Sequence, residues 1–387
     1  MVQINETINF CLDSGFNVRM AINWLSNSGI QNAEGGFHAW YDTEKGKYSF
    51  VYPEATAYAV QILSKLYSKS NEDIYLTKAV KAGDWLLNIQ KNDGSFASKY
   101  FNDSETEKYD RSFHVFDAGI ITCGYLDLYK ITSKIKYLKA AIKTMHLILK
   151  FQNPDGSFSA GLDPHGCLLN NHHWSQTSSC HHIKMLLPLL RLSSITKDKK
   201  YFDCTKRLLQ WSDGLQLSSG RFITFQGSNE TYVHAHCYAL EGLIGASKSF
   251  GITNDSSISK KLRKGVDWLQ RIQNNDGSIW NWSNPHENKI KVCDALSQTM
   301  RLFLLSKKEI YSARSNRKID ERVNRGFTFL KKMQHLNGSY QSLGGISYGE
   351  ANGKKLPHVN TCTTVFAIHA ALLRELETTL PLMEEII

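Results

Sequence analysis

The sequence predicts an all-α fold: an (α/α)6 toroid, which is a closed ring of six tandem helical hairpins with inner and outer helix rings. Similar turns recur six times, about sixty residues apart, and a fixed period of this kind indicates a repeat architecture. Each turn also joins an amphipathic helical pattern to a later helical pattern that is apolar on most sides. Because the repeats cover nearly the whole chain, we expect a single domain over residues 1–387.

Each turn contains a glutamine, a short polar stretch, a glycine and then an aromatic or apolar residue, as in Gln90 to Phe96 and Gln152 to Phe158. Glycine ends helices readily because it accepts the left-handed conformation found just after many helix ends. The turns are therefore expected to end the outer helices, such as the one over residues 264–272. The turn glycines are Gly36, Gly94, Gly156, Gly220, Gly277 and Gly338.

The second helix of each hairpin follows its turn after a longer loop and is rich in small and apolar residues. A helix that is apolar on most sides must be buried, so these helices should form the inner ring. We expect them at residues 54–68, 115–131, 174–193, 234–249, 293–307 and 360–376. An open superhelix would leave such helices exposed, so a closed ring is favoured.

The links between helices give the ring two different faces. Links from an inner helix to the next outer helix are short, as at residues 69–73, whereas links in the other direction are long and hold aromatics, histidines and acids. The long loops therefore gather on one face, together with the N-termini of the inner helices, which favour anions. We expect any functional site in a funnel on this face.

Composition limits the environment and the partners. The chain has no stretch of ~20 apolar residues and no signal pattern at its N-terminus, so we expect a cytoplasmic protein without a transmembrane segment. The eight cysteines include no CxxC pair, which fits a reducing compartment. The net charge of +10 suits a glycan, a phosphorylated lipid or a peripheral membrane contact. We expect no nucleic-acid partner, and solvated surface charge is the favoured explanation of the scattered lysines.

Two turns, with the helices before them, resemble the QW repeats of the squalene–hopene cyclase superfamily. The matching segments run from Lys81 to Phe96 and from Lys264 to Trp280. In that family the glutamine and the aromatic residue tie neighbouring helices together, so the resemblance implies the fold and a structural role for the motif. The Asp-x-Asp-Asp acid motif of triterpene cyclases is absent, which argues against protonation-initiated cyclisation.

The β-subunits of protein prenyltransferases, which share such repeats, hold zinc with an Asp-x-Cys pair and a later histidine. The nearest match here is Cys293-Asp294, in reversed order, followed by His358 and Cys362. These residue types suit zinc, but a match in the wrong order is a weak motif. We therefore expect no cofactor and no metal, with zinc as the alternative.

Shorter segments resemble (α/α)6 proteins that accompany polysaccharide biosynthesis and modification, including glycoside hydrolases, lyases and sugar epimerases. The segment from Tyr52 to Tyr58 is similar to a Tyr-Pro-Glu-x-Thr-Gly-Tyr sequence of such proteins, with Ala57 in place of the glycine. The segment from Phe116 to Gly119 resembles the start of their second inner helix. The resemblance implies a glycan or glycoconjugate substrate in polysaccharide metabolism.

Acids and histidines at the starts of the inner helices are the candidate catalytic residues. Several carboxyl groups at one site can divide into a general acid of raised pKa and a base or nucleophile, as glycoside hydrolysis requires. Histidine titrates near neutrality and suits lyase or epimerase chemistry as well. First-turn acids also cap helices, and a histidine can belong to the core, so these interpretations stay open. The candidates are Glu54, Asp117, His181, His234 and Asp294.

A second group of residues, from the long loops and from the inner helices, is expected to bind substrate. Aromatic rings can stack on sugar faces or line an isoprenoid pocket, and arginine binds carboxylates or phosphates. This group consists of Tyr52, Trp40, Arg111, His173, Trp174, Gln176, His236 and Gln298.

The sequence therefore favours an enzyme, namely a hydrolase, lyase or epimerase that acts on a glycan, including an anionic one, by acid/base chemistry. Two alternatives stay open. An isoprenoid-handling protein, similar to a cyclase or prenyltransferase, would have a deep aromatic cavity with few charges. A non-catalytic toroid would bind a glycan or a partner protein.

Overall fold

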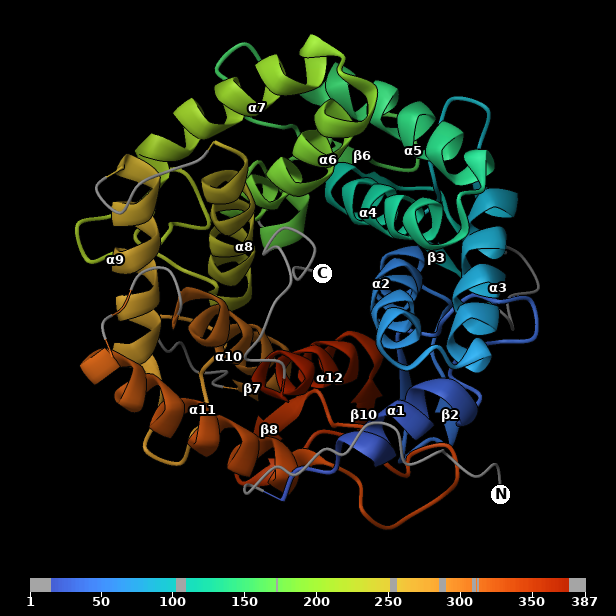
Figure 1. Cartoon of the computed structure of the whole chain (residues 1–387), viewed down its shortest axis with the longest axis vertical. Coiled ribbons are helices and arrows are strands. Elements are labelled where there is room, and N and C mark those ends of the chain that lie inside the picture. The colour runs from blue at the N-terminus through green and yellow to red at the C-terminus, as the bar shows by residue number, and fades with distance from the viewer. Residues whose placement is uncertain are drawn as a thin grey trace.

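The computed structural model describes residues 15–101, 109–171, 173–250, 256–284, 290–307, 311 and 313–375. These residues form two concentric rings of helices, which confirms the predicted (α/α)6 toroid (Figure 1). The outer ring consists of α1 (Val18–Asn27), α3 (Asp73–Ile89), α5 (Ile135–Ile148), α7 (Lys199–Ser212), α9 (Ser257–Ile272) and α11 (Ala313–Met333). The inner ring consists of α2 (Pro53–Ser70), α4 (Val115–Thr132), α6 (Leu186–Thr196), α8 (Val233–Ser249), α10 (Cys293–Lys307) and α12 (Thr361–Glu375).

The third inner helix starts later than predicted. Residues Cys180–Met185 form a 3-10 helix, η3, that leads into α6, and Trp174–Gln176 form a separate 3-10 helix, η2. Pro188 accounts for the late start of α6, because proline has no N–H and its ring clashes with the carbonyl group four residues earlier. An α-helix can therefore hold Pro188 only in its first turn, and the prediction of one helix from residue 174 was wrong.

The turn glutamines tie neighbouring outer helices together. The Nε2 atom of Gln273 donates to the carbonyl oxygens of Gly277, in its own turn, and Arg322, in the next outer helix, both at 3.1 Å. Gln152 bridges Gly156 and Cys204 in the same way. The motif therefore supplies the backbone of each turn with a side-chain partner and joins the turn to the next hairpin.

The sixth glutamine closes the ring. Gln334 Nε2 donates to the carbonyl oxygens of Gly344, at 3.0 Å, and Asn17, at 2.8 Å. Asn17 is the N-cap of α1, and its own N–H donates back to Gln334 Oε1 at 3.0 Å. Strand β1 pairs with β10 at the same seam. The last hairpin is thereby joined to the first outer helix.

Turn glycines allow the turn to approach the next outer helix. A Cβ atom on Gly277 would lie 2.1 Å from the carbonyl oxygen of Arg325, and the φ angle of Gly277 is +86°. In the first turn, the glycine with a positive φ angle that approaches the next outer helix is Gly35 rather than the predicted Gly36. In the last turn it is Gly344 rather than Gly338. The last turn carries an insertion, so the glycine that ends the turn lies further along the chain than the spacing predicted.

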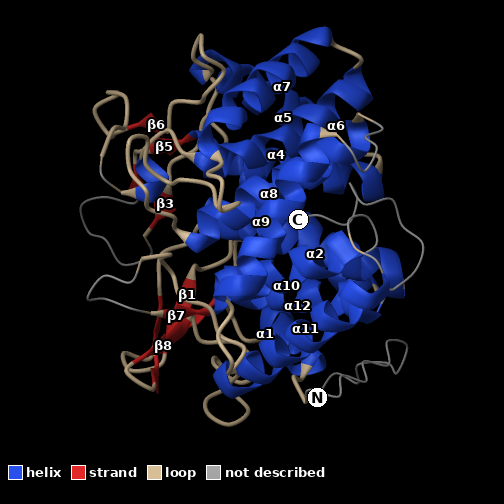
Figure 2. Cartoon of the chain, turned by 90° about the vertical axis from the view of Figure 1, so that its left-hand side faces the viewer, coloured by secondary structure: helices blue, strands red, loops and turns tan. Residues whose placement is uncertain are grey.

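Short strands and long loops lie on one side of the ring, at the N-terminal ends of the inner helices (Figure 2). Within the described ranges, the strands form four small sheets. They are β10-β1-β2 (His358–Asn360, Trp40–Asp42, Lys47–Tyr48), β3-β4 (Lys99–Tyr100, Tyr109–Asp110), β5-β6 (Phe113–His114, Gly161–Leu162) and β7-β8-β9 (Lys291–Val292, Gly349–Ala351, Lys354–Lys355).

The hydrophobic core lies between the two rings and is continuous around them. Inner helices are buried on nearly every side, and α8 is buried without a break from Val233 to Ser247. No helix in the described part of the chain is both long and apolar enough to cross a membrane.

Candidate functional site

The inner elements bring their second residues together at the centre of the ring. The rings of Phe116 and His181 lie 5.1 Å apart, and the charges of Glu54 and Asp294 both help raise the pKa of the Cys362 thiol. We call this layer, with Asp117, the floor. Its second residues are Glu54 of α2, Phe116 of α4, His181 of η3, His234 of α8, Asp294 of α10 and Cys362 of α12.

Two carboxyl groups of the floor share one tyrosine. The side chain of Tyr52, which precedes α2, hydrogen-bonds to both Glu54 and Asp117. Burial raises the pKa of Glu54, and the charge of Asp117 raises it further, while the hydrogen bond from Tyr52 opposes both effects. Burial likewise raises the pKa of Asp117. Each acid therefore holds a proton more readily than an exposed carboxyl group, and ionisation of one resists ionisation of the other.

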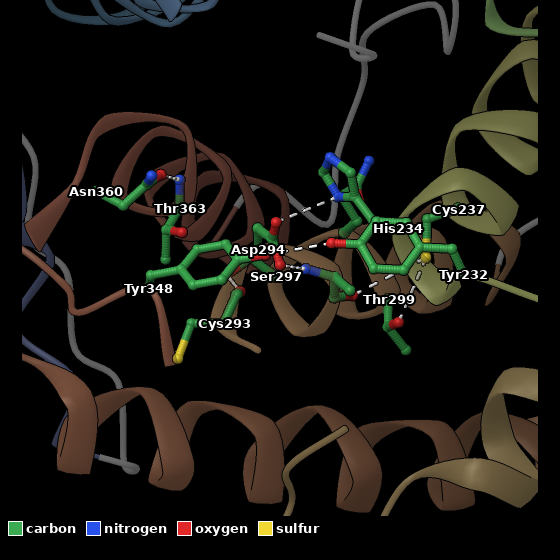
Figure 3. A network of polar contacts seen from close by, with 12 residues as sticks. Tyr232, His234, Cys237, Cys293, Asp294, Ser297, Thr299, Tyr348, Asn360 and Thr363 are labelled. Atoms are coloured by element: carbon green, nitrogen blue, oxygen red, sulfur yellow. Dashed lines mark hydrogen bonds and ion pairs between the residues drawn. The ribbon is translucent and has the colours of Figure 1, made fainter. Parts of the chain in front are cut away.

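A third acid and a histidine face each other across the floor from that pair. Asp294 Oδ2 lies 3.6 Å from His234 Nδ1, and Figure 3 shows the two side chains pointing towards one another. Burial raises the pKa of Asp294 to about 7 and lowers that of His234 to about 3. His234 is therefore neutral at neutral pH. The hydroxyl groups of Tyr232 and Tyr348 lie beside them, 3.2 Å apart.

His181 is completely buried, and neither of its ring nitrogens has a hydrogen-bond partner in the described part of the chain. Its ring lies 4.0 Å from that of His182 and meets Trp174 edge-on at 5.5 Å. Burial, aided by the neighbouring histidines, holds the pKa of His181 well below 6.5. His181 is thus a neutral base. Its ring offers one nitrogen lone pair and one N–H group, neither of which is used in a hydrogen bond within the described residues. His182 instead helps to cap η3 through Ser179.

A buried ion cluster lies one helical turn or more beneath the floor. Lys184 Nζ is 2.8 Å from Glu241 Oε2, and Arg301 Nη2 is 3.3 Å from Glu241 Oε1. Gln298 Nε2 also donates to Glu241, at 3.3 Å. All three charged side chains are at most 1% exposed. Glu241 therefore pairs with two cations that come from different inner elements.

Tyrosines connect the ion cluster to the floor. Lys184 Nζ donates to the hydroxyl group of Tyr58 at 3.1 Å and lies 4.6 Å from the centre of the Tyr238 ring. Tyr58 and Tyr238 hydrogen-bond to each other, and Tyr238 hydrogen-bonds to Glu54. A chain of polar contacts therefore runs from the cluster to the carboxyl pair, and the Lys184 charge lowers the pKa of Glu54.

Among the predicted binding residues, Tyr52 and Trp174 lie at the floor, while Trp40 lies above it in β1. The Trp40 ring is 4.9 Å from that of His358 and 5.2 Å from that of Phe50. Trp174 stacks on Tyr232 at 4.9 Å. These aromatic side chains, apart from Tyr232, remain partly exposed.

Gln298 also contacts the floor, whereas the other predicted binding residues do not gather there. Gln298 donates to Glu241 in the ion cluster and also hydrogen-bonds to His234. His236 is buried between the rings, where its Nδ1 accepts from the Phe222 N–H at 3.1 Å and its Nε2 lies 3.3 Å from the Gly265 carbonyl oxygen. Arg111 is exposed in a loop. We leave His236 and Arg111 out of the proposed site. The remaining two lie in the loop around η2, where His173 binds Ser175 and Gln176 binds Asn171.

Sequence reasoning missed the ion cluster and the tyrosines above it. A signal was present, because Lys184, Glu241 and Arg301 each interrupt a stretch that is otherwise apolar. A buried charge is costly unless it is paired. Three such residues in helices expected to be buried therefore indicate mutual contact across the ring.

The residues named for the zinc alternative are Cys293, Asp294, His358 and Cys362. No group of three or more His, Cys, Asp or Glu side chains within the described ranges is placed to hold a metal ion. His358 lies in β10, where its Nε2 is 3.6 Å from Asp42 Oδ2.

Solved structures similar to this chain are enzymes that act on sugars. The cellobiose 2-epimerase of Bacillus thermoamylovorans has a TM-score of 0.76 at 13% identity, covering 93% of this chain and 99% of its own. An unsaturated glucuronyl hydrolase from a Bacillus strain, responsible for glycosaminoglycan degradation, has a TM-score of 0.69 at 13% identity, covering 93% and 97%. A D-mannose isomerase has a TM-score of 0.69 at 11% identity, covering 92% and 95%.

At such identities the similarity shows the fold alone. A comparison with curated protein sequences finds no significant match. Residues 13–170 and 169–356 each match the prenyltransferase α/α-toroid domain, in agreement with the repeats and with the ring they form. The chain therefore belongs to the prenyltransferase α/α-toroid domain family.

Proposed function

We propose that this protein is a carbohydrate-active enzyme in which Glu54 and Asp117 act together on a glycan, one carboxyl group protonated and the other ionised. The observation that carries the proposal is the contact of one tyrosine, Tyr52, with both carboxyl groups. Buried acids that oppose each other's ionisation tend to hold one proton between them, which supplies an acid and a base at the same site. The sugar-acting enzymes with this fold support a glycan as the substrate.

Glycosidic-bond hydrolysis is the reaction that this pair suits best. Glu54, the more deeply buried acid, donates its proton to the leaving oxygen, while ionised Asp117 faces the anomeric carbon. Two carboxyl groups that share one hydroxyl group lie a short distance apart. Such a distance is closer to the carboxyl separation of retaining than of inverting glycosidases. We therefore propose attack by Asp117 and release of the sugar by water.

The neutral ring of His181 favours a second candidate reaction. An unbound histidine nitrogen can remove a proton from a sugar carbon, as elimination or epimerisation requires. Reaction in D2O separates the two candidates. Epimerisation places deuterium on a sugar carbon of the product, and elimination leaves a carbon–carbon double bond in the sugar, whereas hydrolysis leaves the C–H bonds intact and unlabelled.

The polar floor argues against an isoprenoid substrate. Three carboxyl groups and two histidines meet there, and an ion cluster lies beneath them. An isoprenoid-handling protein is expected to enclose its chain in an aromatic cavity with few charges. A non-catalytic toroid differs from both enzymes because it would show no turnover.

The test is turnover of a panel of linear acidic and neutral glycans, followed by mass spectrometry and NMR. Loss of a general acid or base lowers rates by about 10²–10⁴, so Glu54→Gln and Asp117→Asn should each reduce turnover in that range. Asp84→Asn is the matched control, since Asp84 accepts a hydrogen bond from the Tyr137 hydroxyl group at 2.8 Å in the outer ring.

The melting temperature distinguishes catalysis from helix capping. A catalytic pair predicts that both variants keep a melting temperature close to that of the wild type. Variants that lose stability but retain turnover would show that these acids only cap helices, and would overturn the proposal.

A further inference from the structure

Aromatic side chains above the floor form a first row on the α2 side. Phe50 is the centre of this row, with its ring 5.2 Å from Trp40, 5.7 Å from Tyr52 and 6.2 Å from Phe101. Phe101 is 40% exposed, and the other three rings are partly exposed. Lys99 Nζ lies 5.2 Å from the centre of the Phe50 ring. Row one therefore presents open ring surface beside a cation and ends at Tyr52, the residue that binds both acids.

A second row lies on the α8 side. The rings of Phe225 and Trp282 stack at 6.0 Å, Trp282 lies 4.9 Å from Tyr232, and Tyr232 stacks on Trp174 at 4.9 Å. Phe225, Trp282 and Trp174 are partly exposed. The inner end of row two meets the floor, where Trp174 contacts His234 edge-on at 5.6 Å.

The two rows approach the carboxyl groups from opposite directions. Tyr52 directly precedes α2 and Tyr232 directly precedes α8, and these helices face each other across the ring in Figure 1. Glu54, Asp117 and Asp294 lie where the rows end. A site for one small sugar would need stacking surface on one side of the acids. Two partly exposed rows provide stacking surface on both sides of the acids, which is more than one small sugar would use.

We propose that the site binds a linear oligosaccharide whose sugar units extend to both sides of the Glu54–Asp117 pair. One side of the glycan stacks on row one and the other side on row two, so that an internal linkage lies over the acids. Aromatic rings offer large, rigid apolar faces with little entropy cost, which suits the flat apolar faces of sugars. This inference rests on the proposed function and names its substrate class.

The test is calorimetric binding of two series of one to six units, oligogalacturonates and cello-oligosaccharides. The acidic series is included because Lys99 adjoins row one. Titrations use the Glu54→Gln background, in which turnover should be slowed by about 10²–10⁴. We expect affinity to rise with length in at least one series, by about tenfold or more between two and six units.

Row variants locate the binding surface. Phe50→Leu and Trp282→Leu keep apolar volume but remove one ring from each row, and each should weaken hexasaccharide binding roughly three- to tenfold. Tyr340→Leu is the control, since Tyr340 is 63% exposed and belongs to neither row. Each variant's melting temperature checks its folding.

Three results would overturn the inference. They are no binding in either series, equal affinity for short and long sugars, or a loss of affinity in the variant of one row but not in the variant of the other. A different result would reject the proposed function. If the wild type turns over no glycan while binding grows with length and depends on both rows, the extended site stands and catalysis does not. If the wild type turns over a glycan but binding affinity does not rise with glycan length, the extended site is rejected and the proposed function stands.

Discussion

Lys184 Nζ lies 2.8 Å from Glu241 Oε2 at the centre of the ring, and both side chains are excluded from solvent. Arg301 approaches the same carboxylate from α10. The carboxylate therefore pairs with two cations at once. Its loss should therefore be more harmful than the loss of either cation.

We expect Glu241→Gln to destabilise the protein more than Lys184→Met. The first change breaks two buried ion pairs, whereas the second breaks one and leaves the Glu241–Arg301 pair. Breaking a buried ion pair typically costs about 3–5 kcal/mol, and Glu241→Gln should reach or exceed this range in urea unfolding. Lys136→Met, which breaks an exposed pair with Asp84, should cost less than about 1 kcal/mol. Equal losses for the two buried variants would contradict the charge argument.

Asp294 should link stability to pH. Its pKa is about 7 in the folded protein and 3.8 ordinarily, so the folded state holds this proton more tightly than the unfolded chain. The stabilisation is complete below about pH 4 and is lost as pH rises to about 7. Stability of the wild type relative to Asp294→Asn should therefore fall across that window, by up to about 4 kcal/mol. Urea unfolding at several pH values measures the difference in free energy of unfolding between the wild type and Asp294→Asn. A difference that does not change with pH would argue against a raised pKa of Asp294.

The carboxyl pair should respond in opposite directions to two substitutions. Asp117→Asn removes a negative charge beside Glu54, so the pKa of Glu54 should fall. Tyr52→Phe removes a hydrogen bond that favours the carboxylate, so the pKa of Glu54 should rise. NMR titration of 13C-labelled glutamate reports both shifts without substrate. Shifts in the same direction would show that Tyr52 does not bridge the two acids.

The turn glycines should differ in their tolerance of a side chain. Gly277 and Gly353 both have positive φ angles, +86° and +77°, but only Gly277 approaches another helix. Gly353→Ala should cost about 1–2 kcal/mol, which is the strain of the left-handed conformation. Gly277→Ala should cost clearly more, because the new Cβ atom would lie 2.1 Å from a carbonyl oxygen of α11. Thermal unfolding compares the two variants, and similar losses would mean that the turn can shift.

The ring was predictable because its signal is local and repeated. Residues 293–307 were expected as the fifth inner helix, and α10 occupies the same positions. Apolar periodicity and turn chemistry act within each hairpin, so they can be detected without knowing the rest of the fold. The late start of α6 also has a local cause, Pro188, which was visible in the sequence.

The contacts of the site were less predictable because they cross the ring. Tyr238 reaches Glu54 from the opposite helix, and Lys184 reaches Tyr58 from another hairpin. Such pairs depend on how each inner helix rotates about its axis, which is set by packing between the two rings. Helix starts predicted Glu54, Asp117 and Asp294 as candidates, but not Tyr238 and Lys184, which lower the pKa of Glu54.

Closure of the ring by Gln334 and Asn17 has a kinetic consequence. These two residues lie 317 positions apart in the sequence, so the seam forms only after every intervening hairpin has taken its place. Contacts of such long range slow folding, because the entropy of a large loop must be lost before they form. A molecule with an open seam exposes the flank of α12 that α1 covers. The α1 helix of another copy can occupy that flank, so exchanged dimers are the expected misfolded product of this architecture.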